Sequence, residues 1–281
     1  MGKARIRYSS NPRPESRPYI SGDTFRTLAR HVFDETAWAD PEKIMKGDIV
    51  FVASTGILRF FEKEHPLIKN PYVLITHNGD QNISKEFERY IDGKIIRWYA
   101  QNADFENEKI VPIPIGIENA WWNNNGIVKN FDRARAFSQD KKAAIAFAFN
   151  AKTNLKERVP AIEALRKNHA AEEITGWPRG IKYLKILGGY EFVASPPGNG
   201  IDCIRTWESL CLKTIPIVKD SPATRYFRSI GLPLLLIRQW SELEGMNREK
   251  LHKKYGEMRK GFSCEAIYFD YWEEKIKKNE R

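Results

Sequence analysis

Cysteine is scarce in this sequence, and long apolar runs are missing from it. The three cysteines, Cys203, Cys211 and Cys264, form no Cys-x-x-Cys pair, so neither a disulfide framework nor a zinc site is expected. The longest apolar candidate, residues 232–237, is far shorter than the ~20 residues that span a bilayer. The basic N-terminal stretch lacks the apolar core of a secretory signal. These absences predict a soluble, cytoplasmic protein without a transmembrane segment.

Motifs that bind phosphate through a metal ion or a P-loop lysine are also missing. The chain has no Asp-x-Asp motif for Mg²⁺ or Mn²⁺ and no GxxxxGK[ST] loop. It carries no signature of a helix-turn-helix, RRM, KH or zinc-finger domain. We therefore expect no metal, no cofactor and no nucleic-acid partner.

Positive charge is in excess, with a net charge of +10 over 281 residues. A basic chain attracts polyanions, including nucleic acid and nucleotide phosphates. Because the basic residues are spread along the chain, the excess also fits an ordinary solvated surface. A non-catalytic protein that binds polyanions or nucleic acid on a Rossmann-like fold therefore stays open as the alternative to an enzyme.

Apolar runs in the first half of the chain have the pattern of buried parallel strands. Each run begins with β-branched or aromatic residues and finishes with small or polar ones. We expect strands within residues 48–54, 72–80, 95–104 and 110–119, and an amphipathic helix over residues 23–35.

The same pattern starts again after residues 123–142, a segment rich in asparagine, glycine and charge that is typical of a domain boundary. Strands are expected within residues 143–149, 172–176, 191–196, 215–218 and 232–237, and helices over residues 155–168, 201–212 and 262–278. Two successive βα arrays predict two doubly wound α/β domains, whose ligands bind outside the carboxyl ends of the strands.

The segment between residues 195 and 212 is the most informative for function. Gly198 and Gly200 permit positive φ and close backbone approach directly before a predicted helix. Such a turn offers phosphate its free N–H groups and the positive end of the helix dipole. At helical spacing, Asp202, Arg205 and Glu208 share one face, where arginine suits a phosphate and a carboxylate suits ribose hydroxyls. The alternative without a ligand is an Asp202–Arg205 ion pair on a solvated helix face.

The stretch from residue 196 to residue 218, PPGNGIDCIRTWESLCLKTIPIV, resembles the donor-domain signature of exostosin-like glycosyltransferases. The segments AFAFNAKTNLKER, YISGDTFR, THNGD and PIPIGIEN are similar to other parts of that family's pattern, and together they cover most of the chain. One departure is Ile204, where the family often has a histidine that contacts the donor.

The resemblance implies a GT-B fold, with two Rossmann-like domains facing across a cleft, and an inverting, metal-independent sugar transfer. Residues 1–138 would bind the acceptor, residues 139–261 would bind the nucleotide-sugar donor, and a helix within residues 262–281 would pack back on the first domain. Arg158 and Arg205 would bind the diphosphate and Glu208 the ribose. The rest of the implied donor site consists of Asn154, Gly198, Asn199, Gly200 and Asp202.

An inverting transfer needs a general base in the first domain. Three candidates lie at predicted strand ends, and we rank Asp80 first, then Asp23, then His77. Each has a structural alternative: Asp80 stabilises a turn, Asp23 caps the helix that follows, and His77 is a hydrogen-bonded core histidine.

Glu118, Trp121 and Trp122 are the candidates for acceptor binding. Indole rings stack on sugar faces, although packing at the domain boundary is the preferred explanation of the two tryptophans, because aromatic side chains are used mostly for burial. The acceptor would be a glycan or glycoprotein. Within the family the chain looks more like the members of bacteria and large algal viruses, which include xylosyltransferases, so the resemblance implies UDP-xylose as the donor.

Overall fold

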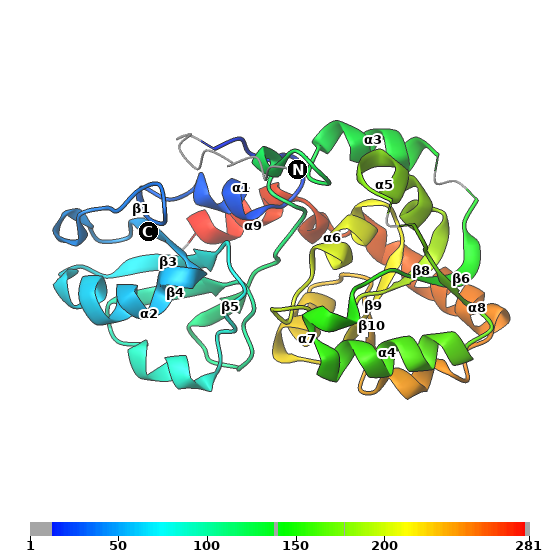
Figure 1. The fold of residues 1–281 in the computed structure, drawn as a ribbon. Helices are drawn as coiled ribbons and strands as arrows, with labels where there is room; N and C mark the ends of the chain where they lie inside the picture. The colour runs from blue at the N-terminus through cyan, green and yellow to red at the C-terminus, as the bar shows by residue number, and fades with distance from the viewer. Residues whose placement is uncertain (1–12, 138–139, 177, 279–281) are drawn as a thin grey trace, which may run out of the picture.

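The computed structural model describes residues 13–137, 140–176 and 178–278. The chain forms two lobes, each built around a parallel five-stranded sheet (Figure 1). The first sheet contains β1 His31–Phe33, β2 Ile49–Ala53, β3 Tyr72–His77, β4 Ile95–Ala100 and β5 Ile110–Pro112. The second contains β6 Lys142–Phe147, β7 Ala171–Glu173, β8 Tyr190–Ala194, β9 Ile215–Lys219 and β10 Leu235–Ile237. The predicted α/β fold class with two parallel, Rossmann-like sheets is confirmed, although the doubly wound strand order is present in the second sheet and not in the first.

The two sheets differ in strand order. The second has the order β10-β9-β8-β6-β7, which reverses between β6 and β8 as in a doubly wound domain. Loops that leave neighbouring strands in opposite directions open a crevice at their carboxyl ends. The first sheet instead runs in chain order from β1 to β5. Hydrophobic patterning predicts strands but not the sheet edge that each strand joins, so this difference was not visible in the sequence.

Helices cover both sheets and connect the strands. The α-helices are α1 Gly22–Arg26, α2 Ile57–Arg59, α3 Val128–Ala136, α4 Leu155–Lys167, α5 Gly180–Gly188, α6 Ile204–Cys211, α7 Pro222–Ser229, α8 Arg248–Met258 and α9 Phe269–Lys277. Short 3₁₀ turns lie at η1 Pro41–Lys43, η2 Ser54–Gly56, η4 His65–Leu67, η5 Lys85–Tyr90, η6 Ala120–Trp122, η7 Ala151–Thr153, η8 Trp240–Leu243, η9 Arg259–Ser263 and η10 Glu265–Ile267, and a π turn at η3 Phe60–Glu64. Within the described ranges, no helix is both long enough and apolar enough to cross a membrane.

The helix predicted over residues 23–35 is wrong beyond its first turn. α1 ends at Arg26, and His31–Phe33 forms the edge strand β1, paired with β2. The guanidinium Nε of Arg26 donates to Asp34 Oδ2 at 2.7 Å, which holds the end of β1 against α1. The hydrogen bonds between β1 and β2 and this buried ion pair stabilise the strand more than the helical spacing of the apolar residues would stabilise a helix.

The segment predicted as a domain boundary contains α3. Phe131 and Ala134 of this helix are fully buried in one core cluster with Leu184 and Leu187 of α5. α3 therefore packs against the second lobe (Figure 1). Residues 138 and 139, where we expected the boundary, lie outside the described residues.

The last helix returns to the first lobe. The ring of Phe25 in α1 meets those of Phe269 and Trp272 in α9, with centroids 5.2 and 6.5 Å away. The Tyr99 hydroxyl at the end of β4 donates to the Lys275 carbonyl at 2.9 Å. The continuous helix predicted over residues 262–278 is instead two 3₁₀ turns followed by α9.

Replacing Trp272 by alanine should lower the free energy of unfolding by about 3–5 kcal/mol, because the side chain is fully buried and leaves a cavity. Denaturant unfolding measures the change. Lys277→Ala, at an exposed position of the same helix, is the matched control and should change stability by less than about 0.5 kcal/mol. Equal stabilities of the two variants would contradict the docking of α9.

Candidate functional site

A cleft lies between the two lobes and consists of two joined cavities. The second-lobe cavity, of about 550 Å³, is lined mainly by the loops that follow β6 and β8 and by α5 and α6. The first-lobe cavity, of about 850 Å³, is lined by the loops that follow β3 and β5 and by η6. Asp80, Ile115, Glu118 and Ile204 line both cavities. The carboxyl ends of both sheets therefore meet at one site.

The glycine loop after β8, residues 198–200, needs its glycines because neighbouring side chains lie too close for a Cβ atom. Neither Gly198 nor Gly200 has a positive φ, so that part of the sequence argument is wrong. A Cβ on Gly198 would lie 2.8 Å from Nη2 of Arg158, and one on Gly200 would lie 2.4 Å from Nδ2 of Asn102 in the first lobe. The Asn154 amide, which caps α4, donates to the Gly198 carbonyl at 3.0 Å and holds the loop.

Three arginine side chains line the same cavity as this loop. Arg158 of α4 is 8% exposed and donates to the carbonyls of Pro197 and Asn150, both at 3.0 Å. These two bonds fix its guanidinium against the cavity that it lines. Arg179, directly before α5, is exposed and lines the same cavity.

Arg205 of α6 completes the group. Its Nη2 donates to the Ala148 carbonyl at 2.7 Å, while its Nε is buried without a hydrogen-bond partner. The Phe149 ring lies 5.6 Å from the guanidinium of Arg205 and 5.7 Å from that of Arg158. Three guanidinium groups thus line a cavity of about 550 Å³.

Glu208 lies one turn beyond Arg205 on α6. Its side chain is buried at 3% exposure, and its Oε1 has no hydrogen-bond partner. Burial raises the pKa of Glu208 to about 7, although Arg205 opposes the rise. Glu208 lines the second-lobe cavity, and its unpartnered carboxylate oxygen suits a ligand with hydroxyl donors.

Asp202 differs from the helical pattern, because α6 begins at Ile204 and not at residue 201. Its Oδ2 accepts from the Ile115 N–H of the first lobe and from Trp207 Nε1, both at 2.8 Å. Its Oδ1 accepts from its neighbour Cys203 N–H at 2.8 Å. Burial raises the pKa of Asp202 to about 6. Asp202 lines the cavity, but both of its carboxylate oxygens already accept hydrogen bonds, one of them from the first lobe.

Asp80 and Asn199 meet across the cleft. The Asn199 amide donates to Asp80 Oδ2 at 3.0 Å, joining the loop after β3 to the glycine loop. Asp80 is exposed and lies where the two cavities join. An acceptor in one cavity and a donor in the other would both lie beside its carboxylate.

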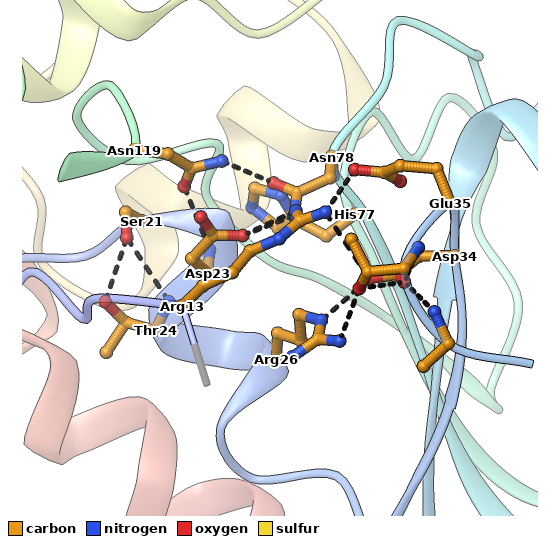
Figure 2. Close-up of polar contacts among 12 residues, drawn as sticks. Arg13, Ser21, Asp23, Thr24, Arg26, Asp34, Glu35, His77, Asn78 and Asn119 are labelled. Atoms are coloured by element: carbon orange, nitrogen blue, oxygen red, sulfur yellow. Dashed lines mark hydrogen bonds and ion pairs between the residues drawn. The ribbon is translucent and has the colours of Figure 1, made fainter. Parts of the chain in front are cut away.

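Asp23 lies in the polar cluster of Figure 2, hydrogen-bonded to Arg13 and Asn78, which line the first-lobe cavity. Its Oδ1 accepts from Arg13 Nη1 at 3.1 Å and from Asn78 Nδ2 at 2.9 Å, and its Oδ2 is buried without a partner. Burial raises the pKa of Asp23. The helix cap is Ser21, which accepts from the Thr24 N–H, so the capping alternative for Asp23 is wrong.

His77, at the end of β3, is 1% exposed and uses both ring nitrogens. Its Nδ1 accepts from the Asn78 N–H at 2.7 Å, so its Nε2 donates to the Pro114 carbonyl at 3.0 Å. Burial lowers the pKa of His77 to about 4. The imidazole is therefore neutral at pH 7, and neither nitrogen is positioned to take a proton from a ligand.

The predicted acceptor residues line the first-lobe cavity. The Trp121 and Trp122 rings stack with centroids 4.5 Å apart, and Trp122 is 45% exposed. The Glu118 carboxylate accepts from the N–H groups of Asn125 and Gly126 and holds the loop that follows η6.

Sequence reasoning missed Arg13, Arg179 and Tyr183. Arg13 lies in a proline-containing stretch without periodicity, and only the fold brings it to the first-lobe cavity. Arg179 and Tyr183 line the second-lobe cavity from the start of α5. The Pro178-Arg179-Gly180 turn before an amphipathic helix was a usable signal for this pair.

The fold and cleft define a two-lobed α/β protein that joins a cation-lined cavity to an aromatic one. Among the described residues, no group of three or more His, Cys, Asp or Glu side chains could hold a metal ion. No family model and no curated protein matches the chain. Among solved structures, the spinosyn rhamnosyltransferase SpnG complexed with thymidine diphosphate aligns with 82% of this chain and 68% of its own. The identity is 12% and the TM-score 0.38, a likeness that assigns no function to this chain.

The raised pKa of Glu208 predicts a pH-dependent stability. Its contribution is full below its unfolded pKa of 4.5 and is lost as the pH rises through about 7. The free energy of unfolding of Glu208→Gln, relative to that of the wild type, should therefore rise by about 1–3 kcal/mol as the pH increases from 4.5 to 7.5. Denaturant unfolding of both proteins across this range measures the difference, in which the contribution of Asp202 cancels. A difference that does not change with pH would contradict the buried carboxylate.

Proposed function

We propose that the protein is a glycosyltransferase that moves a sugar from a nucleotide diphosphate donor to a hydroxyl group of a glycan. The observation that carries the proposal is the second-lobe cavity. There Arg158, Arg179 and Arg205 line one cavity together with the glycine loop and the buried carboxylate of Glu208. Guanidinium groups match phosphate, and a carboxylate matches the two hydroxyls of a ribose.

The donor diphosphate would lie between Arg158 and Arg205, near the start of α6. No side chain caps this helix, so its first N–H groups are available to an anion. Negative charge grows on the diphosphate as its bond to the sugar breaks, and preorganised cations and N–H groups stabilise that charge. The site therefore supplies positive charge from its own residues, and we propose a transfer that needs no metal.

The acceptor would occupy the first-lobe cavity with Asp80 as general base. Its carboxylate takes the proton of the attacking hydroxyl while the new bond forms at the anomeric carbon. The diphosphate leaves with the electron pair of the broken bond, and the anomeric configuration inverts. Asp80 is favoured over Asp23 because it is exposed to both cavities, whereas Asp23 is fully buried. The proposal of UDP-xylose as donor rests on the family resemblance alone.

Arg158→Ala and Arg205→Ala should each weaken the binding of UDP by about 10- to 100-fold, because each removes a charge-assisted bond to phosphate. Calorimetric titration measures the affinities for UDP, and a thermal-shift screen of other nucleotides identifies any that binds more tightly, for which the same loss is expected. Arg166→Ala is the control, since this exposed arginine of α4 pairs with Glu173. Salt-sensitive binding of generic nucleic acid, with no effect of any nucleotide, would favour the polyanion-binding alternative.

Asp80→Asn should lower kcat by about 10²- to 10⁴-fold, the usual contribution of a general base. The affinity for UDP should stay within about twofold, because asparagine keeps an oxygen that can accept from Asn199. The release of nucleoside diphosphate from a nucleotide-sugar, with a panel of glycans, measures turnover. Near-normal turnover would exclude Asp80 and make Asp23 the next candidate.

A further inference from the structure

Acidic side chains dominate the first-lobe cavity. Glu35, Asp80 and Glu118 line it, and Arg13 is the one Lys or Arg side chain among its described lining residues. His77 also lines it but is neutral at pH 7. Asp80 and Glu118 line the second-lobe cavity as well, so Glu35 is the acid that belongs to the first-lobe cavity alone among the described lining residues.

The charge of Arg13 is already neutralised. Its guanidinium forms ion pairs with Asp23 at 3.1 Å, with Asp34 at 3.9 Å and with Glu35. Arg13 is only 7% exposed, and Figure 2 shows the carboxylates around it. An anionic ligand would have to displace Glu35 from Arg13 and lie beside the remaining acids, which costs free energy by like-charge repulsion.

The cavity offers an aromatic surface and an unused acceptor atom. The stacked indoles of Trp121 and Trp122 form an apolar surface, with Arg13 5.6 Å from the Trp121 ring. Gln101 is 1% exposed and lines the cavity. Its amide donates to the Gly79 carbonyl at 2.9 Å, and its Oε1 is buried without a partner. A hydroxyl group can donate to that oxygen, whereas a carboxylate cannot.

We propose that the acceptor is a neutral, hydroxyl-rich saccharide stacked on Trp122, and that Glu35 excludes sugars carrying carboxylate, sulfate or phosphate. This inference rests on the proposed function and specifies the acceptor class of the same cleft. Glu35 is a specificity-determining residue in this scheme and takes no part in the transfer step.

The experiment compares matched pairs of sugars that differ only at C6. Methyl β-glucoside and methyl β-glucuronide form one pair, and methyl β-galactoside and methyl β-galacturonide the other. Each is titrated into the full chain in the presence of UDP, with tryptophan fluorescence as the readout. In at least one pair we expect the neutral sugar to bind about tenfold more tightly than the anionic one. Trp122→Ala should remove the fluorescence change.

The variant Glu35→Gln tests the source of the discrimination. It keeps the size of the side chain and should reduce the ratio of affinities about threefold or more, with UDP binding unchanged. Equal or tighter binding of the anionic sugars to the wild type, no saturable binding of any sugar, or an unchanged ratio in Glu35→Gln would each overturn the inference. UDP binding, measured on the same samples, separates this failure from failure of the proposed function.

Discussion

The hydrogen bonds of Asp202 set the geometry on which the cleft depends. Its carboxylate ties the Ile115 N–H of the first lobe to Trp207 of α6, and its own N–H donates to Asn102 Oδ1 at 3.0 Å. Burying this carboxylate is costly, as its raised pKa shows, but three donors compensate it. The glycine loop is thereby held against the first lobe so closely that Gly200 has no room for a side chain. The joined cavities are a consequence of this contact.

The arginines of the cleft are distributed unevenly between the two cavities. Arg158, Arg179 and Arg205 line the second-lobe cavity, near the point where the second sheet reverses its strand order, whereas Arg13 lines the first-lobe cavity and is paired with carboxylates. A transfer that produces an anionic leaving group gains from this distribution, because the charge would develop beside the guanidinium groups. Asp80, the proposed base, lies where the two cavities join. The arginines therefore lie on the side of the cleft where the proposed reaction needs positive charge.

Sequence patterns predicted the strands that local residue order defines and missed the features that depend on contacts between distant residues. Nine of the ten strands lie within or next to predicted runs, because continuous apolar stretches between polar ones define buried parallel strands. The tenth, β1, shared its residues with a helical pattern, and pairing with β2 decided the outcome. Helical spacing put Asp202 beside Arg205, whereas contacts with the other lobe determine its position. Arg13 carried no local signal, since its partners lie at residues 23, 34 and 35.

The unpartnered buried atoms give a physical reason to regard the cleft as a binding site and not as an interface that only holds the two lobes together. Glu208 Oε1 and Arg205 Nε lie on one helix beside one cavity, and each costs stability that a well-packed interior would avoid. An interface selected only for stability would pair these groups with each other or replace them by apolar side chains. Positions that break the rules of packing concentrate at functional sites, where a ligand supplies the missing partner. A ligand with hydroxyl donors for Glu208 and an acceptor for Arg205 would offset both costs, so its binding and the stability of the second lobe should be coupled.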